Sequence, residues 1–405
     1  MNFDFTEEQI QVRDMVREFA AREVAPHIRE WDQTSGIDRA LIDKIGEMGV
    51  LGLPIPEEYG GLGLDYISLG LACEEFEYVD TALRVILSVH VGLNSLTLLQ
   101  WANEEQKQRW LVPQAQGEKI ATFGLTEPAA GSDAGAIEST VVRDGDHYIL
   151  NGSKMWISLA DIADHFLVFA STDRSLKHKG LTAFVLERGM EGFTTGTIKG
   201  KLGVRAGNTG ELAFDNVRVP VENRIGEEGE GFKIAMSAID QGRFTVAAGA
   251  TGLTRAALDA SVKYANTRQT FGEPIGKHQL VQQMIAKMVA GYEASSLLVW
   301  KAAELKNRGI RNTKETSLAK WYATDVALAA ADDAIQIHGS YGFSNEYPVE
   351  RYMRNARGSV IYEGTSQIHQ IVQAEYALGY RQDKPLSHPQ PPAVGFDEHG
   401  PIEGA

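Results

Sequence analysis

The sequence predicts an α+β protein made of a helical region, a small β region and a second helical region. Apolar residues recur at helical spacing up to about residue 118, short β-branched and aromatic runs follow, and alanine-rich amphipathic stretches begin near residue 232. We therefore expect an N-terminal all-α domain at 1–118, a middle antiparallel β domain at 119–231, a C-terminal four-helix bundle at 232–383 and a Pro-rich tail at 384–405.

The first region has both the start signal and the spacing of helices. Thr6 is of a type that caps a helix N-terminus, and the acidic Glu7 and Glu8 follow it. Apolar residues then recur at helical spacing, at Ile10, Val12, Met15, Val16 and Phe19. Further helices are predicted within 39–48, 67–78 and 85–101, interrupted by the turn-rich LPIPEEYGGLG.

The middle region changes to the period of strands. The runs HYILNG, HFLVFAS, LTAFVLE and GELAFDNVRV are separated by Gly, Asn and Asp turns. Their intervals suit an antiparallel sheet rather than βαβ units.

The last region is predicted as a bundle of four helices, within residues 234–267, 280–307, 313–337 and 365–378. Residues 384–405 hold five of the chain's 13 prolines, too many for a helix. This segment is expected to be an extended arm or a disordered tail.

Composition limits the partners and the compartment. The 405 residues are 43% hydrophobic and 23% charged, which is ordinary for a globular protein. With 39 basic and 54 acidic side chains the net charge is −15, which disfavours nucleic acid or a membrane surface as partner and requires any anionic ligand to meet a local basic pocket. Cys73 is the only cysteine, so no internal disulfide or thiolate metal cage can form.

Targeting signals are not evident. The N-terminal residues carry early acids and have neither the basic and apolar regions of a secretory signal nor the arginines of a transit peptide. No stretch reaches the roughly 18 uncharged apolar residues of a membrane span. We expect a cytoplasmic protein.

Two segments could surround a flat ligand. FGLTEPAAGSDAG, residues 123–135, combines small residues that allow close backbone approach with the hydroxyls of Thr126 and Ser132. NGSKMWIS ends on an aromatic ring beside a hydroxyl, at Trp156 and Ser158. The structural alternatives are a Gly/Pro turn that opens a strand, and a tryptophan buried in the β core.

A third segment, IYEGTSQ at residues 361–367, precedes the last predicted helix, which Thr365 would cap. Glu363 lies there among apolar neighbours. Desolvation raises the pKa of such a carboxyl toward that of a general base near neutral pH. Alternatively, Glu363 is a carboxylate stabilised by the helix N-terminus. The sequence alone leaves both open.

Taken together, the motifs resemble those of the acyl-CoA dehydrogenases. LTEPAAGSD, WIS, AIDQGRFTVAAGATG, TRQTFGEPIGKHQ, QIHGSYGF and IYEGTSQI occur in that family's order and spacing. The resemblance extends from residue 3 to about residue 381. It implies an enzyme of the FAD-dependent type, an oxidoreductase acting on CH–CH bonds, for which a homotetramer built as a dimer of dimers is usual.

The resemblance assigns residues to FAD. In similar proteins FAD lies between the β domain and the bundle, and part of it is contacted from the neighbouring subunit. The flavin-side residues are Phe123, Leu125, Thr126, Gly131, Ser132, Trp156, Ile157 and Ser158. The residues expected at the phosphates and the remaining FAD contacts are Arg268, Gln269, Thr270, Phe271, His278, Gln279, Gln336, Ile337, Gly339, Ser340, Thr365, Ser366 and Gln367.

The resemblance also assigns the thioester site. Ser132, Asp240, Arg243 and Gly364 match the family's CoA-thioester positions, and Glu363 matches its catalytic base. Glu363 would remove the pro-R α-proton while flavin N5 takes the β-hydride, giving a trans-2-enoyl-CoA. The Glu363 N–H and a flavin ribityl hydroxyl would bind the thioester oxygen. Some branched- and long-chain members carry the base directly before the arginine, where this chain has Gly242. The structural alternative for Arg243 is a helix-surface ion pair.

The acyl group is predicted only in part. In FEYVDTALRVILSVHVGL, Glu77 and Arg84 match glutaryl-CoA dehydrogenases, whose arginine binds the far carboxylate of the substrate, and MEGFTTGTIKGKLGVRAGNTG is also similar to them. Val85 stands where those enzymes have serine, so a succinyl- or benzylsuccinyl-type thioester and a plain short-chain acyl-CoA stay open. The structural alternative is an exposed helical pair between Asp80 and Arg84.

The remaining expectations concern partners and competing functions. The resemblance implies electron-transfer flavoprotein as the electron acceptor. The alternatives are an oxygen-using acyl-CoA oxidase, a class that usually carries a further C-terminal domain, and a catalytically silent homologue that binds acyl-CoA or flavin. The ten histidines show no metal-binding spacing, and packing roles are expected for His338 and His369.

Overall fold

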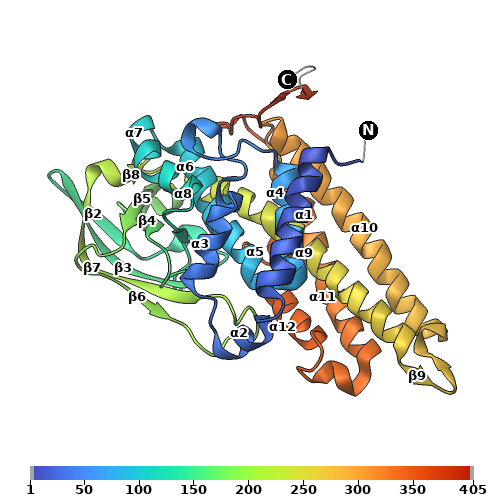
Figure 1. Ribbon diagram of the computed structural model, residues 1–405. Helices are drawn as coiled ribbons and strands as arrows, with labels where there is room; N and C mark the ends of the chain where they lie inside the picture. The colour runs from blue at the N-terminus through green and yellow to red at the C-terminus, as the bar shows by residue number, and fades with distance from the viewer. Residues whose placement is uncertain (1–3, 402–405) are drawn as a thin grey trace.

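The computed structural model describes residues 4–401. The predicted class is confirmed, because a helical region is followed by a β region and a second helical region. In Figure 1 the sheet lies on the left and the long C-terminal helices on the right, with the N-terminal helices in front of the junction.

The first region is helical as predicted. Thr6 caps the first helix through a reciprocal capping box with Gln9. The helices are α1 (Glu7–Phe19), α2 (Ile28–Thr34), α3 (Arg39–Glu47), α4 (Tyr66–Val79), α5 (Thr81–Leu87), α6 (Leu96–Trp101), α7 (Glu104–Gln106) and α8 (Val112–Ala115). The π-helical and 3₁₀ segments are η1 (Ala20–Val24), η2 (Val50–Gly52), η3 (Glu57–Tyr59), η4 (Ser88–Ser95) and η5 (Lys107–Leu111).

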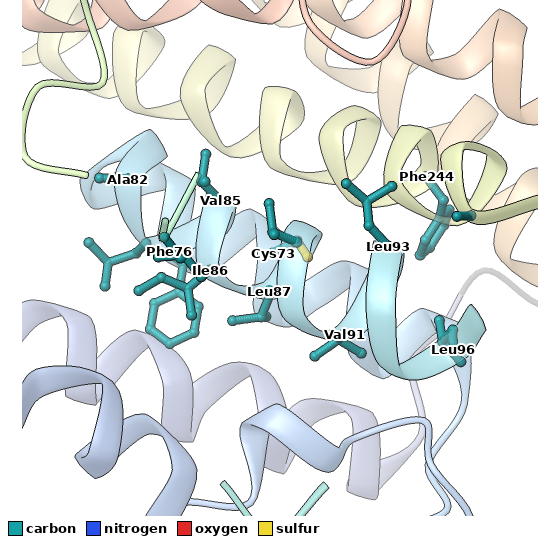
Figure 2. Packing of buried hydrophobic residues seen from close by; sticks show 14 of the residues in the cluster. Cys73, Phe76, Ala82, Val85, Ile86, Leu87, Val91, Leu93, Leu96 and Phe244 are labelled. Carbon is teal, nitrogen blue, oxygen red and sulfur yellow. The ribbon is translucent and has the colours of Figure 1, made fainter. Parts of the chain in front are cut away.

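The stretch Thr81–Trp101 combines α5, η4 and α6 into one buried helical rod. By length and mean hydropathy it could cross a membrane, although it contains Arg84 and several polar residues, but its most apolar window is entirely buried in the protein. Figure 2 shows its apolar side chains packed around Phe76 and Cys73. The rod is therefore a core helix, and burial raises the pKa of the Cys73 thiol.

The rod also connects the β region with the C-terminal helices. The Asn94 side chain donates to the Thr122 carbonyl of the first strand at 2.8 Å. Gly92 lies so close to α9 (Gly231–Thr267) that a Cβ there would be 3.4 Å from the Cα of Gly242. Small residues at this crossing allow the two helical segments to approach backbone to backbone.

The β region contains eight strands in one sheet. They are β1 (Ala121–Gly124), β2 (Thr140–Asp144), β3 (His147–Ser158), β4 (His165–Ser171), β5 (Leu181–Glu187), β6 (Phe193–Thr197), β7 (Thr209–Pro220) and β8 (Arg224–Ile225). The order is β6-β7-β3-β2-β4-β5-β8, with 3₁₀ turns at η6 (Ala134–Ala136), η7 (Arg174–Gly180) and η8 (Val221–Asn223). The antiparallel prediction is wrong at β4, because β1 pairs with it in parallel and β2 meets it in parallel at one position.

The C-terminal region is built around α9. With it pack α10 (Gln279–Asn307), α11 (Thr313–His338), α12 (Val349–Ser359) and α13 (Ser366–Ala377), and the chain also forms η9 (Ile275–Lys277), η10 (Gly339–Phe343) and the hairpin β9 (Gln269–Thr270) and β10 (Glu273–Pro274). Neither α12 nor this hairpin was predicted. The polar sequence of α12 does not predict that one of its faces is buried. On that face Arg351 is paired with the buried Asp80 at 3.0 Å.

The Pro-rich segment lies along the protein as an extended arm. Gln390 donates to the Leu96 carbonyl at 3.0 Å, and the Ala393 N–H donates to the Asn307 carbonyl at 2.8 Å. A small hairpin follows, with strands β11 (Phe396–Asp397) and β12 (Gly400–Pro401). Of the two alternatives, the extended arm is confirmed up to residue 401. Residues 1–3 and 402–405 lie outside the described part, including the start of the motif resemblance and the end of the predicted tail.

Candidate active site

Glu363 lies in a strained loop between α12 and α13. Its φ is 54° and that of Gly364 is 97°, so two successive residues occupy the left-handed region. A non-glycine residue held there is uncommon and often marks a functional position. Thr365 caps α13 by accepting the Ile368 N–H at 3.3 Å. The cap predicted at Thr365 is therefore confirmed.

The carboxylate of Glu363 points into the protein without a partner. Its Oε2 is enclosed and has no hydrogen bond with any residue among 4–401. Burial raises the pKa of Glu363 to about 7, although the nearby cations Arg84, Lys320 and Arg243 oppose the rise. This group can accept and release a proton near neutral pH.

Gly242 gives the Glu363 carboxylate its space. A Cβ at Gly242 would overlap the Oε2 of Glu363, and Leu93 closes the same position from η4. A side chain at residue 242 would therefore compete with Glu363 for one cavity. This explains in steric terms why a chain with its carboxylate at 363 has glycine before Arg243.

Arg243 and Asp240 hold the loop from α9. The Arg243 Nε donates to the Glu363 carbonyl at 3.1 Å, and its Nη1 lies 3.0 Å from Asp240 Oδ1. Asp240 also accepts from Thr313 Oγ1 at 2.6 Å. The ion-pair alternative for Arg243 is half right: the pair exists, but the side chain is only 11% exposed and also contacts the loop.

Two further buried groups brace the loop from α11 and α13. Lys320 Nζ donates to the Gly364 carbonyl at 2.7 Å, and burial lowers the pKa of Lys320 to about 7. His369 Nδ1 lies 2.8 Å from Ser317 Oγ, and burial lowers the pKa of His369 to about 2. A packing role for His369 agrees with this geometry. Lys320 was not predicted from the sequence, because its position inside an alanine-rich helix gives no local signal.

Arg84 is buried beside the same loop. Its guanidinium meets Glu77 at 2.6 Å, Ser88 at 3.0 Å and the Tyr362 hydroxyl at 2.5 Å. Burial disfavours its charge, but Glu77 raises the pKa of Arg84 above its ordinary value. The exposed pair with Asp80 is wrong: Arg84 is 1% exposed, and Asp80 instead accepts from Arg351.

The two segments proposed around a flat ligand lie side by side. The Met155 N–H donates to the Thr126 carbonyl at 2.9 Å, and Thr122 Oγ1 donates to the Ser158 carbonyl at 2.6 Å. A buried ion pair missed by the sequence analysis fixes the loop: Lys154 Nζ lies 2.6 Å from Glu127 Oε1. Glu127 also accepts the Ser139 N–H, which ties the loop to β2.

Trp156 projects from this surface. A β-bulge between Met155 and Ile157 and a φ of 65° turn it outward, leaving it 58% exposed. The interpretation as a core tryptophan is therefore wrong. Around it, Phe123, Thr126 and Ser158 are half-buried, Gly131 and Ser132 are exposed, and Leu125 and Ile157 are buried. An exposed indole beside a glycine-containing loop and free hydroxyls fits a planar aromatic group such as a flavin ring.

The remaining predicted cofactor residues form two other groups. Thr365, Ser366 and Gln367 lie at the start of α13 beside Glu363, where Ser366 Oγ donates to Asp325 at 2.7 Å. The others lie at the far end of the bundle. These are Arg268, Gln269, Thr270, Phe271, His278 and Gln279 around the β9–β10 hairpin, with Gln336, Ile337, Gly339 and Ser340 at the end of α11.

The far group is coherent but remote from the sheet. Tyr264 stacks on His338 at 4.2 Å between ring centroids, which joins the ends of α9 and α11. Thr270 Oγ1 lies 2.9 Å from His278 Nε2, while Phe271 is 98% exposed. Figure 1 shows β9 at the opposite end of the protein from β2, β3 and β7. One chain therefore does not bring all the predicted cofactor residues together.

No metal site is found in the described part of the chain. Within residues 4–401 no group of three or more His, Cys, Asp or Glu side chains is placed to hold an ion. His338 donates or accepts only locally, with Nδ1 at 2.8 Å from the Ala334 carbonyl.

Comparison with known proteins identifies three successive family matches. The acyl-CoA dehydrogenase N-terminal domain matches residues 6–118, the middle domain 122–217 and the C-terminal domain 229–378. A short-chain specific acyl-CoA dehydrogenase of Clostridium acetobutylicum is 45% identical over 372 residues, covering 92% of this chain and 98% of the relative.

Two solved structures are similar over the same extent. A chain from structural work on the electron transferring flavoprotein of Acidaminococcus fermentans is 48% identical with a TM-score of 0.92, covering 93% of this chain and all of the other. A glutaryl-coenzyme A dehydrogenase in complex with glutaryl-CoA is 38% identical with a TM-score of 0.91, covering 96% of this chain and 99% of the other.

The raised pKa of Glu363 predicts a pH-dependent change in stability. An unfolded carboxyl ionises near pH 4.5, whereas the folded one keeps its proton to about pH 7. Between these values the unfolded state binds fewer protons, so the free energy of unfolding falls as pH rises. Glu363→Gln cannot ionise, and we expect it to be more stable than the parent at pH 8 by about 3 kcal/mol and nearly equal at pH 4.5.

Thermal or denaturant unfolding at the two pH values measures this difference. Glu18→Gln is a matched control, because Glu18 is 68% exposed on α1 and should show no pH-dependent gain. Equal stability of Glu363→Gln and the parent at pH 8 would contradict an enclosed, unpartnered carboxylate.

Proposed function

This chain belongs to the acyl-CoA dehydrogenase family, whose members are FAD-dependent oxidoreductases acting on CH–CH bonds, and we propose that it converts a short-chain or dicarboxylyl CoA thioester to its trans-2-enoyl product with Glu363 as the base. The observation that carries this proposal is the enclosed carboxylate of Glu363, which has no protein partner and a pKa near 7. A silent homologue would have no need to keep such a destabilised group.

Glu363 takes the proton in this reaction. Its Oε2 removes the pro-R proton from the α-carbon of the thioester, and the electron pair left behind moves toward the thioester carbonyl. The site would hold FAD, which would supply the acceptor for the hydride that leaves the β-carbon. Leu93 and the α9 backbone at Gly242 enclose the carboxylate and keep water from it, so the proton transfer takes place in a dry site where the base is strongest.

The loop also supports binding of the thioester oxygen. Among residues 4–401 no acceptor is hydrogen-bonded to the Glu363 N–H, so this donor is free for an oxygen that gains charge as the proton leaves. Arg243 holds the Glu363 carbonyl and Lys320 holds that of Gly364. These bonds keep the left-handed turn in place, which aims the N–H and the carboxylate at the same substrate.

The cofactor proposal requires two chains. Trp156, Ser158 and Thr126 would line the flavin ring, and Thr365 to Gln367 would contact it from α13. The Arg268 and Gln336 groups, at the far end of the bundle, would contact the phosphates of FAD bound to a second chain. Exposed apolar residues on α10, including Leu280 and Leu297, give this bundle a surface suited to self-association. We propose a homotetramer.

The acyl group is proposed to be short. The curated relative from C. acetobutylicum is described as short-chain specific. Arg84 favours a second candidate, a dicarboxylyl-CoA such as a glutaryl, succinyl or benzylsuccinyl thioester, because its guanidinium adjoins Tyr362 directly before Glu363. The bond to Glu77 weighs against it, since this carboxylate already balances the charge. Such a substrate would share Arg84 with Glu77.

Electron-transfer flavoprotein is the proposed acceptor. A chain 48% identical to this one comes from work on such a flavoprotein in A. fermentans. An oxidase would instead reduce O₂ directly, and peroxide released at the rate of turnover without a carrier would decide for it. The single buried thiol at Cys73 is consistent with a reducing, cytoplasmic setting.

Glu363→Gln tests the base. We expect the variant to bind FAD and acyl-CoA, but to lose at least about 10³-fold in the rate of anaerobic flavin bleaching, because an amide cannot take the proton. In the parent, kcat/KM should rise through pH 7 and level off above it, since only the ionised base reacts. Full bleaching by the variant, or a flat pH profile between 5.5 and 8.5, would contradict the assignment.

Arg84→Met tests the acyl group. Butyryl-, isobutyryl-, glutaryl-, succinyl- and benzylsuccinyl-CoA are compared for flavin reduction by the parent and the variant. If Arg84 binds a substrate carboxylate, activity with the acids should fall about 10²-fold or more while butyryl-CoA changes little. A matched variant, Glu77→Gln, should raise affinity for the acids by freeing the guanidinium. Equal losses on both substrate classes would leave Arg84 as a structural ion-pair residue.

A further inference from the structure

A cavity of about 470 Å³ opens beside the N-terminal half of α9. Its walls come from α6, α9, the turn between α10 and α11, and the extended arm after α13. Four of its lining side chains are Lys or Arg, namely Lys233, Lys306, Arg311 and Arg381, and only Asp240 is acidic. In a chain with 39 basic and 54 acidic residues this is a local reversal of charge. The cavity is therefore suited to an anionic ligand.

The cavity adjoins the proposed thioester site through α9. Phe232, Met236 and Asp240 line it at helical spacing, and Asp240 is bonded to Arg243, which reaches the Glu363 carbonyl. From residue 232 to residue 243 the helix rises about 16 Å. A ligand that reacts at Glu363 and lies along this face would place a group well removed from its reacting carbon in the basic cavity.

The outer wall of the cavity is the C-terminal arm. His388 packs on Trp101 with 4.3 Å between ring centroids, and Gln390 is bonded to the Leu96 carbonyl. Arg311 holds the arm from beneath, donating to the Lys384 carbonyl at 2.8 Å and pairing with Asp383 at 3.0 Å. The match to the C-terminal family model ends at residue 378, so this wall lies beyond the part of the chain that the family model describes.

Two of the cations keep binding capacity. Arg381 pairs with Glu375 at 3.6 Å and lies over the Tyr376 ring, and Lys233 pairs with Glu230 at 3.3 Å, both at partly exposed positions. Such loose surface pairs contribute little and exchange readily for a stronger anion. Lys306 instead donates its hydrogen bonds to Gln241 and the Asp240 carbonyl. It therefore adds positive electrostatic potential to the cavity but makes no direct bond to a bound anion.

We propose that the C-terminal arm, residues 381–401, forms with α9 a binding site for the phosphorylated nucleotide end of the CoA thioester, with Arg381 and Lys233 as its phosphate contacts. The inference rests on the proposed function, because it takes the reacting end of the ligand to lie at Glu363. The arm thereby selects substrates by their carrier: a thioester of CoA gains the site, and a thioester of pantetheine alone does not.

The first experiment removes the arm. The chain truncated after Tyr380 is compared with the full chain for whichever acyl group reduces the flavin, supplied as its CoA thioester and as its pantetheine thioester. We expect truncation to raise KM for the CoA thioester about 10-fold, with kcat within 2-fold and KM for the pantetheine thioester unchanged. Equal changes for both thioesters, or none for CoA, would overturn the proposal.

A second experiment keeps the arm in place. Binding of adenosine 3′,5′-bisphosphate, the nucleotide end of CoA, is measured by calorimetry on the full chain and on the double variant K233A/R381A. We expect the variant to lose about 10-fold in affinity, while Arg218→Ala, which removes an exposed arginine on β7, has no effect. An unchanged Kd in the double variant would overturn the site even if the truncated chain does not fold.

The two proposals fail separately. If CoA thioesters reduce the flavin but neither variant distinguishes the carrier, the nucleotide site is wrong and the dehydrogenase function stands. If no thioester reduces the flavin while adenosine 3′,5′-bisphosphate binds and loses affinity on substitution, the site stands and the dehydrogenase function is wrong.

Discussion

The structure depends on one unfavourable arrangement, an enclosed carboxylate with no partner at Glu363. A carboxylate oxygen that is enclosed without a hydrogen bond costs free energy when the group is ionised, and a left-handed backbone at the same residue adds strain. The carboxylate position and the left-handed backbone both persist because contacts with neighbouring helices fix the conformation of the loop against its own conformational preference. Arg243 from α9, Lys320 from α11 and the Thr365 cap of α13 each fix a different backbone group of the turn. The positive charges of Arg84, Lys320 and Arg243 partly offset the effect of burial, so the pKa of Glu363 stays near 7.

Close packing around α9 makes this arrangement possible. Three glycines on this helix face large neighbours, because a Cβ at Gly242, Gly249 or Gly252 would overlap Glu363, Glu77 or the Glu74 carbonyl respectively. The helix thus approaches α4, η4 and the loop without side chains of its own in between. The same closeness places the Glu77–Arg84 pair against the back of the site. The position of the Glu363 carboxylate and the packing of α9 therefore depend on each other, and a larger residue at Gly242 would disturb both.

The sequence predicted the elements well where the pattern was long and periodic. Thr6 and Thr365 were placed as caps, and α9, α10 and α11 began and ended within a few residues of their predicted ranges. It failed where tertiary contacts override local pattern. The parallel pairing of β1 and β4 depends on a strand that follows directly after the helical region. The helix α12 is polar in sequence, but its Arg351 is buried against Asp80. Trp156 is turned outward by a β-bulge. For the site, the motifs supplied the candidate residues, and their roles stay predictions. The partners Lys320, Lys154 and Glu127 became visible only in space, since nothing in their local sequence links them.

The charges of this chain are distributed unevenly: the chain is acidic as a whole, but basic side chains gather at particular positions. A net charge of −15 repels polyanions at long range, yet each group of positions expected to meet a phosphate contains a basic side chain: Arg268 beyond the end of α9, and Lys233 and Arg381 around the cavity at its other end. Because screening limits surface interactions to about 10 Å at ordinary ionic strength, such local groups act on a bound phosphate almost independently of the total. An acidic surface and anionic ligands are therefore compatible. The position of an anion on this chain is therefore decided by these local cations rather than by the net charge.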